Sequence, residues 1–207
     1  MKKMLLVLAL LFGSSAFDSH AQTFFIGGEV GAALYPDFSS DVARSTVNAG
    51  ASSATVKQDC CGAAVGVFGG VWINNNFGVE AAYTDLGNVE GKVTTVPASN
   101  TFYEYSASAA SLAGLGGITL GSRGTLYGKL GAYKASVEFR SATRSITTDS
   151  SGLLIGGGYS HRFGKHLLGK AEIAVYNDVK FQTFNAPQGT TTSDAIVKIA
   201  VGAAYAF

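Results

Sequence analysis

Residues 195–207, AIVKIAVGAAYAF, form the stretch that decides the fold. Alternate positions carry the larger apolar and aromatic side chains, and this set comprises Val197, Ile199, Val201, Ala203, Tyr205 and Phe207. The positions between them are small, apart from Lys198. Because successive side chains of a β-strand point to opposite faces, a period of two predicts a strand. An apolar face opposite a small, polar face is typical of a strand between lipid and a narrow interior.

The other end of the chain resembles an export signal. Residues 1–3 include two lysines, residues 4–12 are all apolar, and small or polar residues lead to Ala21. This layout predicts a secretory signal peptide over 1–21, cleaved after Ala21, with Ala16 as the alternative. A retained anchor is disfavoured because nine helical residues rise only about 14 Å, against a hydrocarbon core of ~30 Å. Residues 22–207 are then expected to form one domain.

Composition narrows the class of protein. The sequence holds 15 Lys and Arg against 14 Asp and Glu, and the leader contains two lysines and one aspartate, so the remainder is neutral. A basic stripe is missing, which argues against nucleic acid as a partner. Outside the leader, no apolar run approaches the ~20 residues of a membrane-spanning helix, although mean hydropathy is positive. A membrane β-barrel and a soluble β-sandwich or barrel remain as alternatives.

Eight segments have strand-like patterns: 23–35, 62–73, 77–86, 102–120, 125–139, 151–163, 167–180 and 194–207. Short turns rich in Gly or Asn follow the second, fourth and sixth segments, at 74–76, 121–124 and 164–166. Long connections separate the others, at 36–61, 87–101, 140–150 and 181–193. Strict alternation of short and long connections favours an all-β, eight-stranded antiparallel up-and-down transmembrane β-barrel. It disfavours an immunoglobulin-like sandwich, whose crossovers are irregular.

Residue size decides which face points inward. Charged residues on the strands share a face with Gly and Ala, and the interior of an eight-stranded barrel is just wide enough for its side chains. We therefore expect a lumen charge network of Glu29, Glu80, Lys129, Lys170, Glu172 and Lys198, with Arg162 near the tight-turn end. Such charges should pair with one another. A packed, ion-paired core is the favoured interpretation, and a gate or ion path is the alternative.

Aromatic residues on the opposite face gather near the tight turns: Phe24, Phe77, Phe163, Tyr205 and Phe207. They fit an aromatic girdle at the level of the lipid headgroups. Trp72 breaks this pattern because strict alternation turns it inward. Either a β-bulge shifts the register there, or Trp72 closes the floor of the barrel.

With these residues in view, the chain resembles the transmembrane domain of the OmpA family of outer-membrane barrels. The resemblance is carried by GVFGGVWINNNFGVEAAYTDLG (66–87), LYGKLGAYKASVEF (126–139) and IGGGYSHRFGKHLLGKAEIAVYND (155–178). It implies inward polar positions at Glu29, Glu80, Lys129, Lys170 and Glu172. It also implies residence in the lipid of the bacterial outer membrane. The ending with Val201, Ala203, Tyr205 and Phe207 is similar to the signal read by the barrel assembly machinery, by strand addition at an open edge.

The sequence departs from this family at two points. Leu115 and Ser160 stand where the family carries its proposed gating charges, so the resemblance does not imply a family-type gate. The periplasmic peptidoglycan-binding domain of full-length OmpA is also missing, so tethering to the cell wall is not implied.

Other chemistry is weakly supported. Cys60 and Cys61 permit a disulfide in an oxidising compartment, but a vicinal bond closes a strained ring, so separate loop thiols or cross-links between chains are favoured. Two thiols without a nearby His do not indicate a metal site. Ser160 and His161 are neighbours on a strand and point to opposite faces, which hinders a hydrolase arrangement with Glu172. We expect no enzyme and no cofactor.

The sequence therefore predicts a monomeric barrel that acts as a structural scaffold. Its four long connections would be displayed outside the cell, for adhesion or envelope integrity, with an extracellular ligand or host surface as partner. A small ion or solute pore is the first alternative. A lipid-modifying membrane enzyme is the second.

Overall fold

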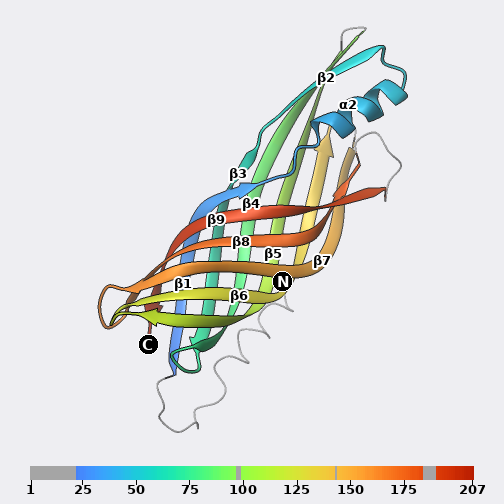
Figure 1. Ribbon diagram of the computed structural model, residues 1–207. Helices are drawn as coiled ribbons and strands as arrows, with labels where there is room; N and C mark the ends of the chain where they lie inside the picture. Colours follow the sequence, from blue (N-terminus) through green and yellow to red (C-terminus); the bar gives the residue numbers. More distant parts are fainter. Residues whose placement is uncertain (1–21, 97–98, 143, 184–189) are drawn as a thin grey trace.

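The structure is a computed structural model that describes residues 22–96, 99–142, 144–183 and 190–207. The predicted signal peptide over 1–21 lies outside the described residues. Most of the chain forms one long, slanted β-barrel, with a helix and a short strand at one end (Figure 1). The strands are β1 (Thr23–Leu34), β2 (Ser53–Gln58), β3 (Cys61–Trp72), β4 (Phe77–Val96), β5 (Ser99–Leu120), β6 (Gly124–Ser141), β7 (Arg144–Arg162), β8 (Leu167–Gln182) and β9 (Thr191–Ala206), and the helix is α2 (Ser39–Asn48).

Eight strands close into a ring. Consecutive barrel strands pair antiparallel, β4 pairs with both β3 and β5, and β1 pairs with β9 from Phe25 opposite Ala206 to Leu34 opposite Val197. The ring excludes β2, which pairs only with β4. Because the ring is closed, none of its strands has a free backbone edge at the level where all eight strands pair, as a barrel in lipid requires. The predicted eight-stranded up-and-down barrel is confirmed.

The tight turns gather at one end of the barrel, at the lower left of Figure 1. In the β3–β4 turn the Asn74 side-chain oxygen accepts hydrogen bonds from the backbone N–H groups of Asn76 and Phe77, both at 2.8 Å. In the β5–β6 turn Gly121 has a φ of 66°, a conformation that costs glycine little. Local side-chain chemistry therefore sets these turns, as the sequence indicated.

Two of the four predicted long loops are instead mostly strand. β4 runs to Val96 and β5 starts at Ser99, and β6 runs to Ser141 and β7 starts at Arg144. β8 ends at Gln182 and β9 starts at Thr191. The prediction of loops over 87–101 and 140–150 is therefore wrong, whereas among the described residues of 181–193 only 181–182 and 191–193 are strand. One cause in β4 is a β-bulge between Asp85 and Asn88, and β8 carries a second bulge between Tyr176 and Val179. Because a bulge shifts side-chain alternation by one residue, the strand pattern looks interrupted in the sequence.

Gly87 makes the first bulge possible. Its φ is 74°, and a Cβ atom added there would lie 2.3 Å from the carbonyl oxygen of Ala63. Both the backbone conformation and the close approach of β3 therefore require glycine at this position.

The connection 35–60 contains α2 and β2, which the sequence interpretation did not anticipate. Asp37 precedes the helix, and its carboxylate accepts a hydrogen bond from the Ser39 N–H at 2.8 Å. Val42 and Thr46, one turn apart, are the buried residues of α2, and Val42 belongs to the buried apolar cluster inside the barrel. This connection therefore folds over the barrel end instead of forming an open loop.

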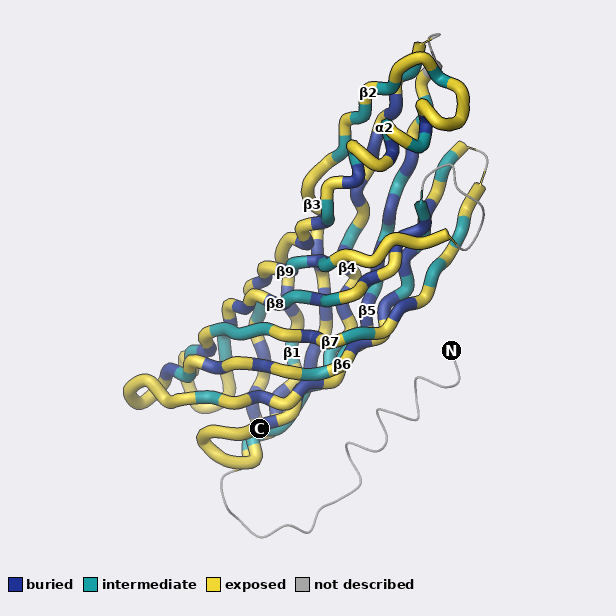
Figure 2. The backbone as a smooth tube through the Cα atoms, turned by 45° about the vertical axis from the view of Figure 1, so that its right-hand side comes forward, coloured by how far each residue is buried: buried dark blue, intermediate teal, exposed yellow. Residues whose placement is uncertain are grey.

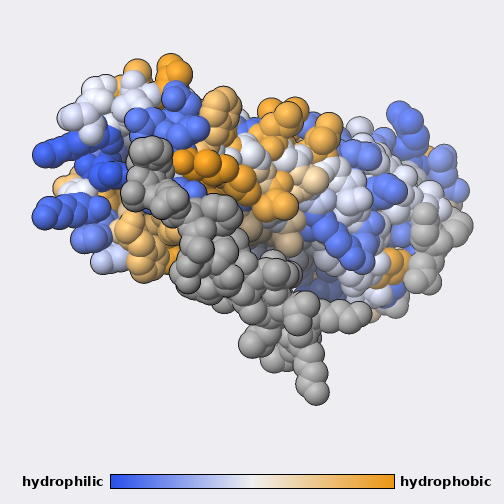
Figure 3. Space-filling model, turned by 90° about the horizontal axis from the view of Figure 1, so that it is seen from below, coloured by the Kyte–Doolittle hydropathy of each residue, from blue (hydrophilic) through white to orange (hydrophobic). Residues whose placement is uncertain are grey.

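The wall has an apolar exterior. Buried and exposed residues alternate along the barrel strands (Figure 2), and the exposed ones include Ile26, Val67, Leu112, Leu130 and Val201. Hydrophobic side chains gather on the middle of the face shown in Figure 3, with hydrophilic ones towards both ends. Among the described residues, no helix is long and apolar enough to cross a membrane.

Candidate functional site

The six inward charges predicted on the strands form one buried ion cluster. Every one of these residues is at most 8% exposed. Lys129 Nζ on β6 lies 2.9 Å from Glu80 Oε1 and 2.8 Å from Glu172 Oε1. The same amino group thus bridges carboxylates on β4 and β8. We call Glu29, Glu80, Lys129, Lys170, Glu172 and Lys198 the ion cluster.

The other two lysines complete the cluster. Lys170 Nζ lies 3.1 Å from Glu29 Oε2, 3.3 Å from Glu80 Oε2 and 3.4 Å from Glu172 Oε2. Its contact with Glu29 has ion-pair distance without hydrogen-bond geometry. Lys198 pairs with Glu29 and lies 3.3 Å from Glu172. Glu172 therefore contacts all three lysines, and the three charges of each sign balance within one layer.

Aromatic groups adjoin the ion cluster on its tight-turn side. The Tyr127 hydroxyl donates a hydrogen bond to Glu172 Oε2 at 3.1 Å, and Lys170 Nζ lies 3.5 Å from the centre of the Phe68 ring. Phe25, Phe68, Leu115, Tyr127 and Ala204 pack into a buried apolar layer here. Leu115, at a proposed gating position of the family, is therefore part of this layer.

Trp72 and Arg162 lie below this apolar layer, at the tight-turn end. The β1–β3 register is unbroken from Leu34 to Thr23, so there is no bulge at Trp72. Trp72 points inward and packs edge-on against Tyr127, with ring centres 6.5 Å apart. Arg162 is exposed and has no ion pair with the described carboxylates. Its placement in the charge network is wrong because β7 reaches the open end of the barrel two residues after Ser160.

A second apolar region fills the barrel on the other side of the ion cluster. At its far end four rings pack together under α2: Phe38, Tyr105, Phe139 and Phe181. Phe38 lies 4.8 Å from Phe181 and 5.4 Å from Tyr105 between ring centres. The Tyr105 hydroxyl donates to the Gln182 carbonyl at 2.7 Å. We call these four residues the aromatic cap.

Tyr103 adjoins the aromatic cap and has a strongly perturbed pKa. Its ring lies 5.8 Å from that of Tyr105, and its hydroxyl donates to Gln58 Oε1 at 3.0 Å. Burial, and then the nearby charge of Asp37, raise the pKa of Tyr103 to about 12. At the loop end, the Ser39 N–H holds the pKa of Asp37 below its usual value. Tyr103 is therefore neutral at ordinary pH and Asp37 is ionised.

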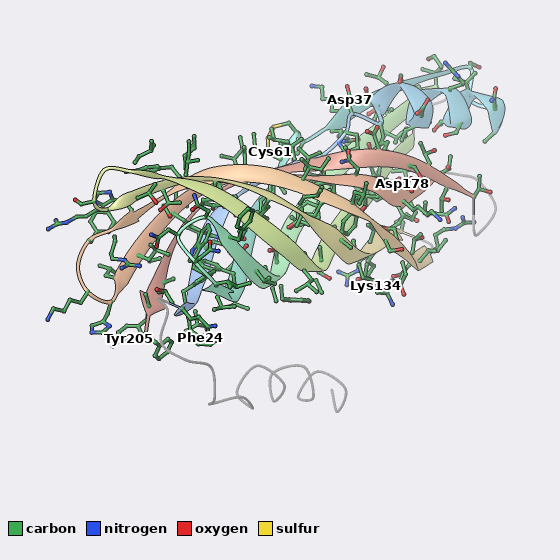
Figure 4. All side chains as sticks on the ribbon, turned by 60° about the horizontal axis from the view of Figure 1, so that its bottom comes forward. Phe24, Asp37, Cys61, Lys134, Asp178 and Tyr205 are labelled. Atoms are coloured by element: carbon green, nitrogen blue, oxygen red, sulfur yellow. A yellow bond between two sulfur atoms is a disulfide. The ribbon has the colours of Figure 1, made fainter. Side chains whose placement is uncertain are left out.

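The predicted girdle residues Phe24, Phe77, Phe163, Tyr205 and Phe207 are all exposed on the outer wall, each at 46% or more. Phe24 and Tyr205 lie at the same end of the barrel, far from Asp37 (Figure 4). His166, in the β7–β8 turn, stacks on Tyr205 with ring centres 5.1 Å apart. Val201 and Ala203, predicted with Tyr205 and Phe207 as the assembly signal, lie on the outward face of β9. The roles in lipid contact and assembly stay predictions.

Cys60 and Cys61 form a vicinal disulfide at the start of β3, where Figure 4 labels Cys61. The interpretation that disfavoured a vicinal bond is therefore wrong. Both residues are exposed, and the Cys60 carbonyl accepts a hydrogen bond from the Tyr35 N–H at 3.0 Å. No group of metal-binding side chains occurs among the described residues.

Ser160 and His161 point to opposite sides of β7. Ser160 is 6% exposed and faces inward, whereas the His161 ring lies on the outer wall beside Tyr159 and Phe163. His161 Nδ1 lies 3.1 Å from the Tyr159 hydroxyl and not next to a nucleophile. This arrangement offers no serine–histidine pair for acyl transfer.

A closed antiparallel barrel with an apolar outer band and buried, paired charges defines a transmembrane β-barrel of the outer-membrane class. Over residues 19–207 the chain matches the OmpA-like transmembrane domain, and it belongs to this family. It is an outer-membrane protein of bacteria, and in this class of barrel the short turns face the periplasm.

Solved outer-membrane barrels share the fold at low sequence identity. OprG from Pseudomonas aeruginosa is 16% identical with a TM-score of 0.60, covering 90% of this chain and 96% of OprG. Neisserial surface protein A is 12% identical with a TM-score of 0.53, covering 91% of this chain and all of that one (100%). The N-terminal barrel domain of Pseudomonas aeruginosa OprF is 10% identical with a TM-score of 0.52, covering 90% and 97%. No curated protein sequence matches the chain.

Proposed function

We propose that this protein is a closed structural scaffold whose tall outer end presents a contact surface outside the cell. The observation that carries the proposal is the height of the wall beyond its apolar band. Beyond the β4 bulge, residues 88–96 add about 30 Å of strand at roughly 3.3 Å per residue. The hairpins β4–β5 and β6–β7 both continue in this direction.

The filled interior favours the function of a scaffold and argues against that of a pore. The ion cluster lies between the layer around Tyr127 and the apolar region under α2, and its charges neutralise one another. A conducting path needs wetted polar groups along its whole length, whereas apolar constrictions exclude water.

Charged and apolar groups on the outer side of the tall wall support a role in surface contact. Phe102 is 61% exposed, and Lys92 Nζ lies 5.6 Å from the centre of its ring. Nearby, the Arg140 side chain donates two hydrogen bonds to the Glu138 carboxylate, at 2.8 and 2.9 Å. Exposed aromatic and arginine side chains are the types enriched at protein interfaces.

Conductance in planar bilayers tests the closed scaffold. Purified barrel, shown to be folded by its shifted mobility in unheated gels, is expected to give no stable current steps. Regular steps that persist in the folded fraction would overturn the closed scaffold and favour the pore.

Attachment of cells to surfaces coated with collagen or fibronectin tests the contact role. Cells that produce the protein should attach more than cells that lack it, and the double variant Lys92→Gln, Phe102→Ser should lose most of that gain. Lys165→Gln, at the periplasmic end, is the matched control and should keep it. Equal attachment with and without the protein, together with unchanged envelope resistance to detergent, would remove the proposal.

A further inference from the structure

A cavity of about 250 Å³ opens at the periplasmic end of the barrel. Trp72 forms part of its wall, and its polar lining includes Thr23, Arg123, Thr125, Ser160 and Arg162. The apolar layer with Phe25 and Tyr127 separates this cavity from the ion cluster. The cavity is therefore a compartment of its own.

Two arginines line this cavity, and no Asp or Glu side chain of the described residues pairs with either. The Arg162 N–H donates to the Arg123 carbonyl at 2.8 Å, so the end of β7 and the β5–β6 turn are held side by side. Neither guanidinium forms an ion pair with an Asp or Glu of the described residues. The reason is visible in the sequence, because the segments 22–28, 69–79, 116–128, 158–169 and 203–207 contain no Asp or Glu.

This charge distribution has a chemical consequence. A concave, low-dielectric site lined by one sign of charge concentrates ions of the opposite sign. The planar guanidinium presents N–H donors in a fork that matches the oxygens of phosphate, and hydroxyls such as that of Ser160 add further donors. Two such cations favour a ligand that carries more than one negative charge.

We propose that the periplasmic cavity binds a phosphate-bearing anion through Arg123 and Arg162, with Ser160 and Thr125 as additional donors. The site is independent of the contact surface on the outer end. Its ligand has two sources, a phosphate-bearing solute of the periplasm or the headgroup of an inner-leaflet phospholipid next to the aromatic residues Phe24 and Phe163.

Titration with pyrophosphate in neutral detergent, free of phospholipid, tests the solute source. Backbone NMR signals of Gly124, Ser160 and Arg162 should shift and saturate. Arg162→Gln should weaken the affinity about tenfold or more, as loss of a charge-assisted contact worth about 1.4 kcal/mol predicts. Lys165→Gln removes the same charge at the same end but lies outside the cavity lining, and should change the affinity less than twofold.

Nanodiscs test the headgroup source. If the same signals shift in anionic phosphatidylglycerol but not in neutral-detergent pyrophosphate titrations, and Arg162→Gln abolishes the shift, the ligand is the lipid headgroup. If neither probe shifts these signals, or if Lys165→Gln weakens binding as much as Arg162→Gln, the site is overturned. Gel mobility before and after heating confirms that each variant is folded.

Discussion

The interiors of the two halves of this barrel are held together by different interactions. In the membrane half, three lysines and three glutamates neutralise one another in a single layer between apolar neighbours. In the outer half, rings from the N-cap of α2 and from β5, β6 and β8 pack without buried charge pairs among the described residues. Removing one partner of a buried ion pair leaves a charge unpaired and strongly lowers the stability of the fold. Deleting apolar atoms lowers stability in proportion to the volume removed. The halves should therefore respond differently to substitution.

The largest effect is expected from Lys129→Met. The variant leaves Glu80 and Glu172 with one fewer buried cation, and breaking a buried pair costs about 3–5 kcal/mol. Denaturant unfolding in micelles, followed by gel mobility, measures it. Lys134→Met on the same strand is the control, since the Lys134 side chain is 72% exposed and its contact with Asp149 is 3.6 Å long. A similar loss in both variants would contradict the importance of the ion cluster.

Phe38→Ala tests the outer half. Removing a ring from the aromatic cap should cost about 3 kcal/mol, and the loss should appear as local opening of α2 and not as collapse of the barrel. Hydrogen exchange of the backbone amides of α2 and β2 reports this opening. Phe102→Ala deletes an exposed ring of the same size and should leave exchange unchanged. Loss of the heat-dependent gel shift in Phe38→Ala would show that the halves are not separable.

Gly87→Ala tests the β-bulge in β4. An alanine there must adopt a φ of 74° and places its Cβ against the Ala63 carbonyl, so we expect a loss of about 2 kcal/mol. Thermal unfolding of the folded protein in detergent measures it. Gly164→Ala, with open space around its Cβ, should be neutral. Equal stability of the two variants would show that β4 tolerates a different path.

The smallest effect is expected from alkaline pH on the outer half. The pKa of Tyr103 is about 12 in the folded protein and near 10 when exposed, so the folded state holds its proton more tightly. Its contribution to stability is full below about pH 10 and is lost as the pH rises through about 12. Tyrosinate absorbance near 295 nm, compared between the native chain and Tyr103→Phe, follows this titration. A Tyr103 signal complete by pH 10 would contradict its burial.

The sequence correctly predicted which strand residues face inward, because the alternation of side chains and the size of their neighbours indicate the face. Lys198, Glu172 and Lys129 all lie on the inward faces of their strands, as alternation and residue size alone predicted. The prediction failed where a β-bulge changes the alternation of side chains, as at Gly87 in β4, beyond which the strand was predicted to be a loop. It placed Arg162 near the tight-turn end, but alternation did not indicate that the side chain is exposed there and lies apart from the ion cluster.

The sequence by itself determined the barrel, because the period of two, the turn residues and the order of connections are local properties of the chain. Only the tertiary structure decided which charges meet, that α2 folds over the outer end, and that two arginines line one cavity. Those outcomes depend on the stagger between strands distant in sequence, and stagger is set by closure of the whole ring.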